Sequence, residues 1–237
     1  GQAIGRDITL TGEDGNKFMA FIAESTNPVD AQVLIYPDIR GLHQFYKDLT
    51  LRFAEIGVRA LAVDYFGRTA GAGARDDQFD FTPHVQAMTF PDFMSDVRAA
   101  LEHLWAEKRD TPTFLIGFCR GGTLALLTGT QDLRLAGLIA FYSGLSRPIV
   151  GAGGETLALA HNVRFPVLGL YGGADQGIPA GDIGKLDLEL DAADVEHELV
   201  IYPGATHSFF DRKQIEFANE SADAWSRVVK FIEGHST

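Results

Sequence analysis

Three residue types that work together in hydrolytic catalysis follow three separate apolar runs of this chain. A cysteine, an aspartate and a histidine come in that order, within Gly117-Phe118-Cys119-Arg120-Gly121-Gly122, Gly172-Gly173-Ala174-Asp175 and Thr206-His207-Ser208-Phe209. A thiol can attack a carbonyl carbon, an imidazole can carry the proton, and a carboxylate can orient the imidazole. The order nucleophile, acid, histidine is one of the known orders of a catalytic triad. We therefore expect Cys119, Asp175 and His207 to act as one set.

The segment around Cys119 has the pattern of a nucleophile elbow. It reads G-x-C-x-G, the cysteine form of G-x-S-x-G, between the strand-like run Thr113–Ile116 and a helical run that begins at Arg120. Flanking glycines let the strand and the helix approach closely around a turn that strains the central residue. By itself the motif also fits a buried small hydrophobic residue before a glycine turn. The downstream aspartate and histidine favour the catalytic interpretation.

The position of Cys119 before a helix suits thiolate chemistry. The dipole and the unpaired N–H groups of a helix N-terminus stabilise a negative charge there. An oxyanion formed at the substrate carbonyl would be held by the N–H of Arg120 and by a second N–H after the strand ending at Tyr36, which we assign to Ile39. In the alternative without catalysis, Asp175 only caps a glycine turn and His207 only bonds a nearby carbonyl.

Strand and helix patterns alternate along the chain. A hairpin is predicted over Asp7–Leu10 and Lys17–Ala23, and buried strands over 31–36, 58–63, 113–116, 138–142, 166–171 and 198–202. Helices are predicted over 43–55, 91–108, 120–130, 179–190 and 216–232. This alternation predicts an α/β fold with a mostly parallel central sheet and helices on both faces. Sites in such sheets form at the carboxyl ends of the strands, where the three candidate residues lie.

No repeat or linker divides the sequence, so one domain over residues 1–237 is predicted. The segment from Thr69 to Phe90 is glycine-rich at first and then acidic and aromatic. It is longer than most connections in compact domains. A lid over the site and a mobile surface excursion both remain open for it.

Composition limits the class of protein. The chain is 46% hydrophobic and 22% charged, as globular proteins are, and its net charge is −12. That charge argues against nucleic acid and anionic membranes as partners, although local arginines can still bind a small anion. A single cysteine cannot form an internal disulfide, no apolar run has transmembrane length, and the start shows no signal peptide. We expect a cytoplasmic protein of undetermined oligomeric state. No zinc-binding, dinucleotide or Walker motif occurs, so no metal or organic cofactor is expected.

These motifs resemble those of the dienelactone hydrolase family of α/β-hydrolases. The similarity runs from about Ala31 to the C-terminal helix, and it rests on the cysteine elbow with its Gly-Gly ending, on Gly173-Ala174-Asp175 with Pro179 following, and on Thr206-His207-Ser208-Phe209. A cysteine in such an elbow is fairly specific to that family among α/β-hydrolases. The resemblance implies the α/β-hydrolase fold and hydrolysis of small esters or lactones, with an acyl-thioester intermediate on the cysteine.

The resemblance also implies roles for residues near the proposed set. Arg68 matches a family arginine that binds a substrate carboxylate, and Arg40 is a second candidate for an anionic substrate group. Asp38 stands where the family has a glutamate that helps form the thiolate, and it is one methylene shorter. The family's best-studied branch has an arginine four positions after the histidine; here that place is Asp211, and Arg212 follows it. The second carboxylate contact and dienelactone itself as substrate are therefore left open.

Two other functions fit the same residues. One is a thioesterase or general carboxylesterase, which would use the same set on a different acyl compound. The other is a protein without turnover that binds a ligand or senses redox state through Cys119.

Overall fold

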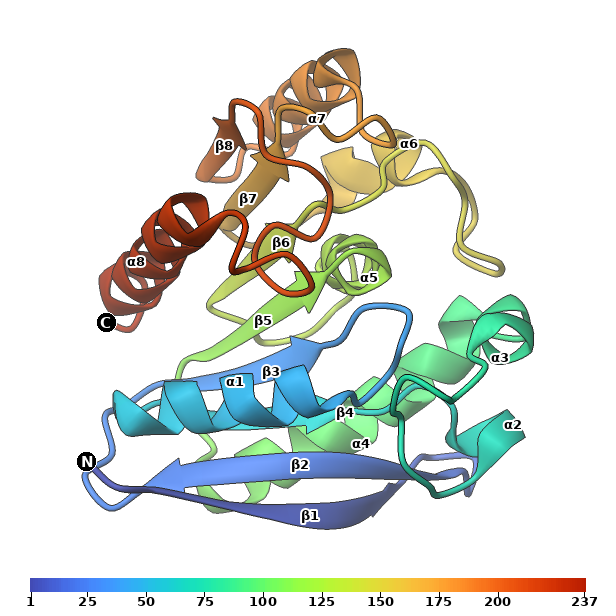
Figure 1. Ribbon diagram of the computed structural model, residues 1–237, viewed down its shortest axis with the longest axis vertical. Coiled ribbons are helices and arrows are strands. Elements are labelled where there is room, and N and C mark those ends of the chain that lie inside the picture. The colour runs from blue at the N-terminus through green and yellow to red at the C-terminus, as the bar shows by residue number, and fades with distance from the viewer. The chain divides into compact units, whose positions relative to one another are not determined.

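The structure is a computed structural model that describes residues 1–237, and the chain folds into two compact units. Unit 1 comprises residues 1–113 and 150–152, and unit 2 comprises residues 114–149 and 153–237. The colour bar of Figure 1 locates both: residues 1–113 of unit 1 run from blue to green, and unit 2 runs from green to red, apart from the short yellow piece 150–152 that belongs to unit 1.

Unit 1 contains four strands in the order β1-β2-β4-β3. They are β1 (Ala3–Thr11), β2 (Lys17–Ser25), β3 (Gln32–Tyr36) and β4 (Arg59–Val63). β1 and β2 form the predicted antiparallel hairpin, which Thr11 and Lys17 close. β3 and β4 pair in parallel and are buried along their whole length. Burial on both faces explains why their sequences are apolar without alternation.

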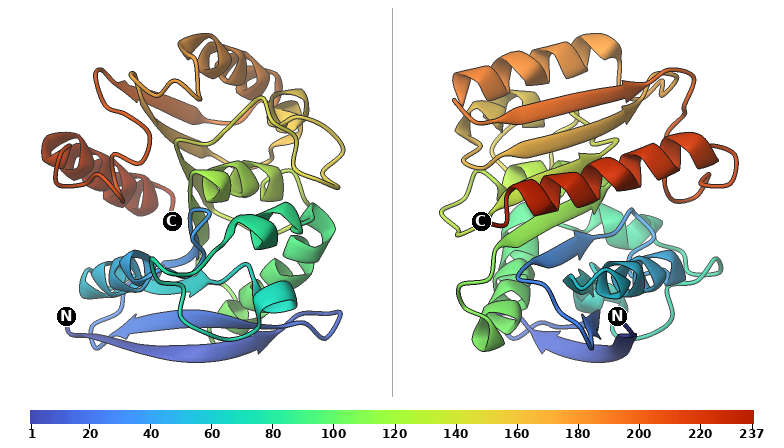
Figure 2. Two further views of the ribbon diagram at one scale, coloured as in Figure 1. Left: turned by 45° about the vertical axis from the view of Figure 1, so that its right-hand side comes forward. Right: turned by 90° about the vertical axis from the view of Figure 1, so that its left-hand side faces the viewer.

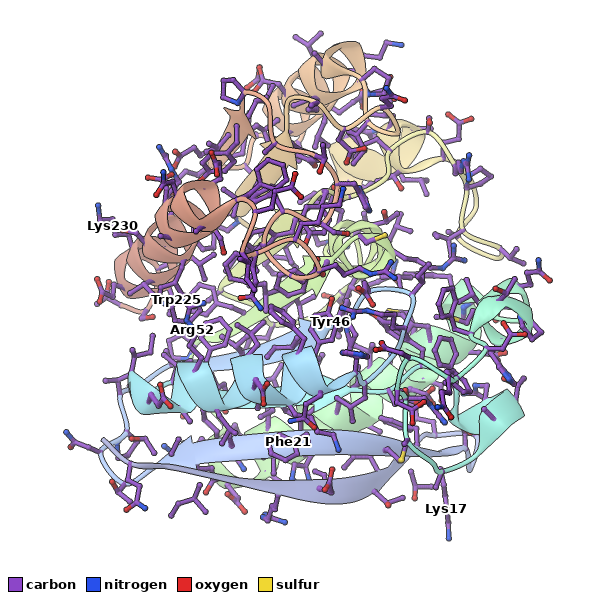
Figure 3. The ribbon with its side chains drawn as sticks, in the orientation of Figure 1. Lys17, Phe21, Tyr46, Arg52, Trp225 and Lys230 are labelled. Carbon is purple, nitrogen blue, oxygen red and sulfur yellow. The ribbon has the colours of Figure 1, made fainter.

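Two long helices cover opposite faces of the unit 1 sheet, α1 (Gln44–Glu55) and α4 (Phe90–Glu107) (Figures 1 and 2). His43 caps α1 and Thr89 caps α4, each by accepting an N–H of the first turn with its side chain. Figure 3 labels Tyr46 on α1, whose ring is fully buried. The helices therefore begin where a polar side chain replaces the missing backbone acceptor.

The segment predicted to be irregular contains two short helices, α2 (Gly67–Ala70) and α3 (Thr82–Gln86). Neither helix buries a residue of its own. They lack the repeated apolar positions by which a helix is recognised from sequence, which is why the prediction missed them.

Unit 2 contains four parallel strands in the order β5-β6-β7-β8, the first of which starts at the unit boundary. They are β5 (Thr113–Phe118), β6 (Gly137–Phe141), β7 (Val167–Gly172) and β8 (His197–Tyr202). Neighbouring strands are in continuous register, with Phe118 beside Phe141 and Phe141 beside Leu170. Parallel strands bring their carboxyl ends to one edge, so the residues that follow β5, β7 and β8 face the same end of unit 2.

Helices flank both faces of the unit 2 strands (Figure 1). On one face lie α5 (Arg120–Thr128), α6 (Thr156–Leu159) with the 3-10 turn Ala160–Asn162, and α7 (Ala180–Ala192); on the other lies α8 (Ala218–Gly234). Lys230 is exposed on α8, and Figure 3 shows it pointing away from the strands. Every long helix and strand predicted from the sequence is present, with ends displaced by a few residues. None of the helices is both long and apolar enough to span a bilayer.

Candidate active site

Cys119 occupies a strained turn between β5 and α5. Its φ of 60° and ψ of −120° lie in a region that residues with a side chain rarely adopt. The flanking glycines make the turn possible: a Cβ on Gly117 would collide with the backbone oxygen of Gly121, and one on Gly122 would lie 2.7 Å from the oxygen of Phe141. This is the geometry of a nucleophile elbow, and it gives the G-x-C-x-G pattern its physical cause.

Backbone hydrogen bonds hold the elbow in place. The N–H of Cys119 donates to the carbonyl of Phe141 at 3.0 Å, and its own carbonyl accepts from Gly122 at 3.0 Å and Thr123 at 3.2 Å. Arg120 is the first residue of α5. The first N–H groups of a helix have no acceptor within the helix, so the backbone of Arg120 is suited to receive an anion.

His207 and Asp175 meet although 32 residues separate them in the chain. Nδ1 of His207 lies 2.6 Å from Oδ2 of Asp175, whose other carboxylate oxygen accepts from the N–H of Gly177 at 3.0 Å. Asp175 is buried, whereas the His207 side chain is 39% exposed. The carboxylate therefore orients an imidazole that solvent can still reach, and Nε2 is the ring nitrogen left for proton transfer.

The neighbours Asp175 and Cys119 affect how the imidazole of His207 titrates. Burial lowers the pKa of His207, but the interactions with Asp175 and Cys119 outweigh burial and raise this pKa from 6.5 to about 10. The imidazole is thus positively charged at neutral pH. The structure joins Asp175 and His207 of unit 2 by a hydrogen bond, and Cys119 contributes to the electrostatics of the same imidazole.

Aromatic rings lie beside His207, and the sequence analysis did not single them out. The ring of Tyr142 lies 4.9 Å from that of His207, and Phe209 lies 5.5 Å from Tyr142. Tyr142 directly follows β6 and has a φ of 35°, so it is a second strained residue at a strand end. The one available signal was its position: it follows a strand of the same parallel set, as Cys119 does.

Ile39 belongs to a tight turn of unit 1 after β3. The N–H groups of this turn are used in succession: Arg40 donates to the Asp38 carboxylate, Gly41 to the Asp38 carbonyl, and Leu42 to the Asp64 carboxylate. The N–H of Ile39 makes none of these bonds. A backbone donor left over in an otherwise satisfied turn is available to an external acceptor.

The Asp38 carboxylate and the Arg40 guanidinium pair with each other. Nε of Arg40 lies 2.9 Å from Oδ2 and 3.1 Å from Oδ1 of Asp38, which is 2% exposed. Each residue thereby neutralises the other, so neither presents an unpaired charge. Their predicted roles, in thiolate formation and in binding an anion, stay predictions.

Arg68 lies at the start of α2, and three aspartates surround it. Its guanidinium bonds the Asp14 carboxylate in the β1–β2 turn, the Asp96 carboxylate on α4 at 3.0 Å, and the carbonyl of Asp92 at 3.0 Å. The hydrogen bond with Arg68 lowers the pKa of Asp14 to about 2, whereas burial raises the pKa of Asp96 to about 6. In this arrangement Arg68 joins the hairpin turn to two helices, and a substrate carboxylate would have to compete with Asp14 and Asp96 for it.

Comparison with known proteins assigns the family. The sequence pattern of the Dienelactone hydrolase family matches residues 18–236, which includes nearly all of both units. The chain belongs to the dienelactone hydrolase family. It is 30% identical, over 96% of its length and 87% of the relative's, to a Yersinia pestis protein with a provisional assignment as a carboxymethylenebutenolidase. It is 31% identical to a protein of Methylorubrum extorquens with the same provisional assignment, over 83% of this chain and 69% of that one.

Solved structures of dienelactone hydrolases share the fold of this chain. One from Klebsiella pneumoniae, itself a provisional assignment, superposes with a TM-score of 0.83 at 24% identity, covering 98% of this chain and 99% of the other. A dienelactone hydrolase-like promiscuous phosphotriesterase from metagenomic libraries superposes with a TM-score of 0.81 at 20% identity over the whole of both chains. The predicted α/β-hydrolase fold is thus confirmed. Family and fold together make the protein a hydrolase of ester or lactone bonds.

Arg212 is the last of the predicted substrate contacts in this chain. It follows His207 by five residues in unit 2. Its side chain is exposed and makes no hydrogen bond, while its N–H donates to the buried Asp211 at 2.7 Å. Among the arginines predicted to bind substrate, Arg212 is the one whose guanidinium is not already paired with a carboxylate.

Two features of unit 2 lie away from the strand ends that carry Cys119 and His207. A cavity of about 390 Å³ lies near the first residues of β7 and β8. Charged side chains that line it form ion pairs with one another, Arg227 with Glu198 and His235 with Glu196. Beside it, Asp187, Asp191 and His197 bring one ligand atom each within 4.8 Å of one another. His197 forms ion pairs with both aspartates, at 2.9 and 3.5 Å, and this pairing explains the cluster without a metal.

Proposed function

We propose that this family member hydrolyses small ester or lactone substrates through Cys119, His207 and Asp175. The proposal is supported by the hydrogen bond between His207 and Asp175, by the strained elbow that carries Cys119, and by the influence of Cys119 on the pKa of His207. The charged His207 favours a thiolate partner, which is the nucleophilic form of cysteine. Asp175 keeps the imidazolium oriented and stabilises its charge.

The acylation step follows from these positions. The Cys119 thiolate attacks the carbonyl carbon, a C–S bond forms, and the carbonyl π electrons move to the oxygen. The N–H groups of Arg120 and Ile39 are proposed to hold that oxyanion. Its collapse breaks the C–O ester bond, and His207 gives its proton to the leaving alkoxide, which yields an acyl-thioester and a neutral imidazole.

Deacylation returns the residues to their starting state. Neutral His207 takes a proton from water as the water oxygen attacks the thioester carbonyl. The second tetrahedral intermediate collapses, breaks the C–S bond and releases the carboxylic acid. The thiolate and the imidazolium are then restored, so proton and electron pair balance over the cycle.

We further propose that the preferred substrate carries a negative charge. Arg212 supports this proposal most directly because its guanidinium is exposed and unpaired. To bind a substrate, Arg40 would first have to break its ion pair with Asp38. Arg68 would have to break its ion pairs with Asp14 and Asp96. A guanidinium binds a carboxylate through two parallel hydrogen bonds.

The test is a comparison of the wild-type protein with Cys119→Ala on a panel of activated esters and small lactones. We expect kcat/KM to fall by at least about 10³-fold in the variant. Mass spectrometry of the quenched wild-type reaction should show an acyl adduct on Cys119, and His207→Gln should form that adduct more slowly. Equal turnover by wild type and Cys119→Ala would exclude the cysteine mechanism.

A further inference from the structure

A buried ion pair joins two segments of unit 1 outside the proposed catalytic set. Asp64, which follows β4, is 1% exposed, and Arg75, in the segment between α2 and α3, is 5% exposed. Nε of Arg75 lies 3.3 Å from both carboxylate oxygens of Asp64, and its Nη2 lies 3.1 Å from Oδ2. A buried charge of this kind is retained only with a partner in good geometry.

Asp64 also fixes the turn that carries Ile39. Its Oδ1 accepts from the N–H of Leu42 at 3.1 Å, and its Oδ2 accepts from the N–H of Phe66 at 3.0 Å. Between Ile39 and Leu42, Gly41 adopts a φ of 78°, and a Cβ there would lie 2.6 Å from Oδ1 of Asp64. The carboxylate thus packs directly under the turn and accepts the N–H of Leu42.

Arg75 extends this contact into the segment between α2 and α3. Its guanidinium donates to the carbonyl of Gly71 at 2.5 Å and lies 4.6 Å from the centre of the Phe79 ring. Phe79 in turn stacks on His84 of α3 at 5.3 Å. Arg75 therefore links Gly71 and Phe79 of this segment to the Asp64 carboxylate under the turn.

We infer that Asp64 and Arg75 are positioning residues, which hold the turn 38–43 so that the N–H of Ile39 keeps the orientation required of an oxyanion donor. The inference rests on the proposed function for the role of Ile39. The geometry on which it depends, the contacts of Asp64 with Leu42 and Arg75, belongs to unit 1 alone. Loss of Arg75 leaves a buried carboxylate without its counter-charge, so the carboxylate moves toward water and releases Leu42.

The chain offers a matched control for the loss of a buried arginine. Arg59 is 4% exposed and bonds Glu24 at 2.7 Å, Glu107 at 3.0 Å and the carbonyl of Leu104 at 3.1 Å. It begins β4, whereas Asp64 follows the other end of that strand. Arg59→Met therefore removes an equally buried arginine, with its ion pairs, from the same unit without touching the turn.

The experiment compares Arg75→Met, Arg75→Lys and Arg59→Met in the full chain. On a neutral ester we expect Arg75→Met to lower kcat about 10- to 100-fold with KM within threefold of wild type, because misplacing a donor weakens transition-state contacts. Arg75→Lys, which keeps the charge without the planar fork, should recover part of kcat. Arg59→Met should lower the melting temperature without a comparable loss of kcat.

Amide hydrogen exchange gives a second measurement that does not depend on turnover. In Arg75→Met the amides of Leu42 and Phe66 should exchange at least about tenfold faster than in wild type, while those of β3 and β4 keep their protection. Unchanged exchange at Leu42, or a kcat no lower than that of Arg59→Met, would overturn the inference. Cys119→Ala in the same assay separates the two proposals, since its full activity would refute the cysteine mechanism whatever Arg75 does.

Discussion

At the scale of single residues, the protonation of His207 determines when the proposed site is active. Its folded-state pKa of about 10 lies above the ordinary 6.5, so the charged imidazole is favoured by the folded protein. The resulting stabilisation is fully present below pH 6.5 and is lost as pH rises through about 10. The thiolate–imidazolium pair should therefore also be lost as the pH rises through about 10, because His207 then loses its proton.

We therefore predict that the alkaline limb of kcat/KM follows His207 and moves when Asp175 is changed. In Asp175→Asn the carboxylate that raises the pKa of His207 is gone, so the limb should shift to lower pH and the plateau rate should fall by at least about 10²-fold. The measurement is a pH–rate profile from pH 5 to 11 on a neutral ester. An alkaline limb at the same pH in both proteins would show that His207 does not control it.

The substrate charge can be tested at Arg212. Replacement of this exposed guanidinium by a neutral amide in Arg212→Gln should raise KM for a carboxylate-bearing ester by about tenfold, as expected for loss of one charged hydrogen-bond pair. KM for the methyl ester of the same compound should stay within twofold. Arg134→Gln, which changes another arginine of unit 2, serves as the control for net charge. Equal effects on the charged and neutral substrates would assign Arg212 no part in anion binding.

At the scale of elements, the close approach of β5 and α5 is what allows Cys119 its strained conformation. The approach depends on glycines, because a Cβ on Gly122 would meet the Phe141 oxygen at 2.7 Å, inside van der Waals contact. By contrast, Gly184 lies in the exposed middle of α7 with nothing within 4 Å of an added Cβ. The same substitution should thus have opposite effects at the two sites.

Gly122→Ala should destabilise the protein by about 2 kcal/mol or more, and Gly184→Ala should stabilise it by about 0.5–1 kcal/mol. The first must push backbone apart, whereas the second removes the helix penalty of glycine at an open position. Urea unfolding of both variants measures the difference. A neutral effect of Gly122→Ala would mean that β5 and α5 can separate without cost.

At the scale of the whole molecule, the chain that carries the proposed site has a net charge of −12. Several arginines are already neutralised by carboxylates, among them Arg40, Arg59, Arg68 and Arg75. The long-range field should therefore repel an anionic substrate even where a local guanidinium binds it. Salt screens such a field, whose range is about 10 Å at 0.1 M ionic strength.

We predict that kcat/KM for an anionic ester rises severalfold between about 10 and 300 mM sodium chloride, because screening weakens the repulsion. For the matching neutral ester it should change little. Initial-rate assays of both substrates across this range provide the measurement. A fall with salt for the anionic ester would show that positive groups near the site dominate the approach.

Local patterns in the sequence determined the strands, the long helices and the elbow. A buried parallel strand reads as an apolar run, a helix repeats its apolar residues every three or four positions, and a strained strand–helix turn requires glycine beside Cys119. These constraints act between residues that are close along the chain, so they leave a pattern that can be recognised in the sequence. The short helices α2 and α3 were missed because they bury nothing and leave no such pattern.

Only the tertiary structure decided which charges meet. Asp175 and His207 are 32 residues apart, and Arg68 reaches 54 residues back to Asp14. Sequence order could propose the first pair because both follow strands of one parallel set, but it could not reveal that Arg68 is held by aspartates or that Arg75 pairs with Asp64. The reason is physical: a side chain pairs with whatever the folded backbone brings within about 3 Å, and that neighbour is a property of packing, not of position along the chain.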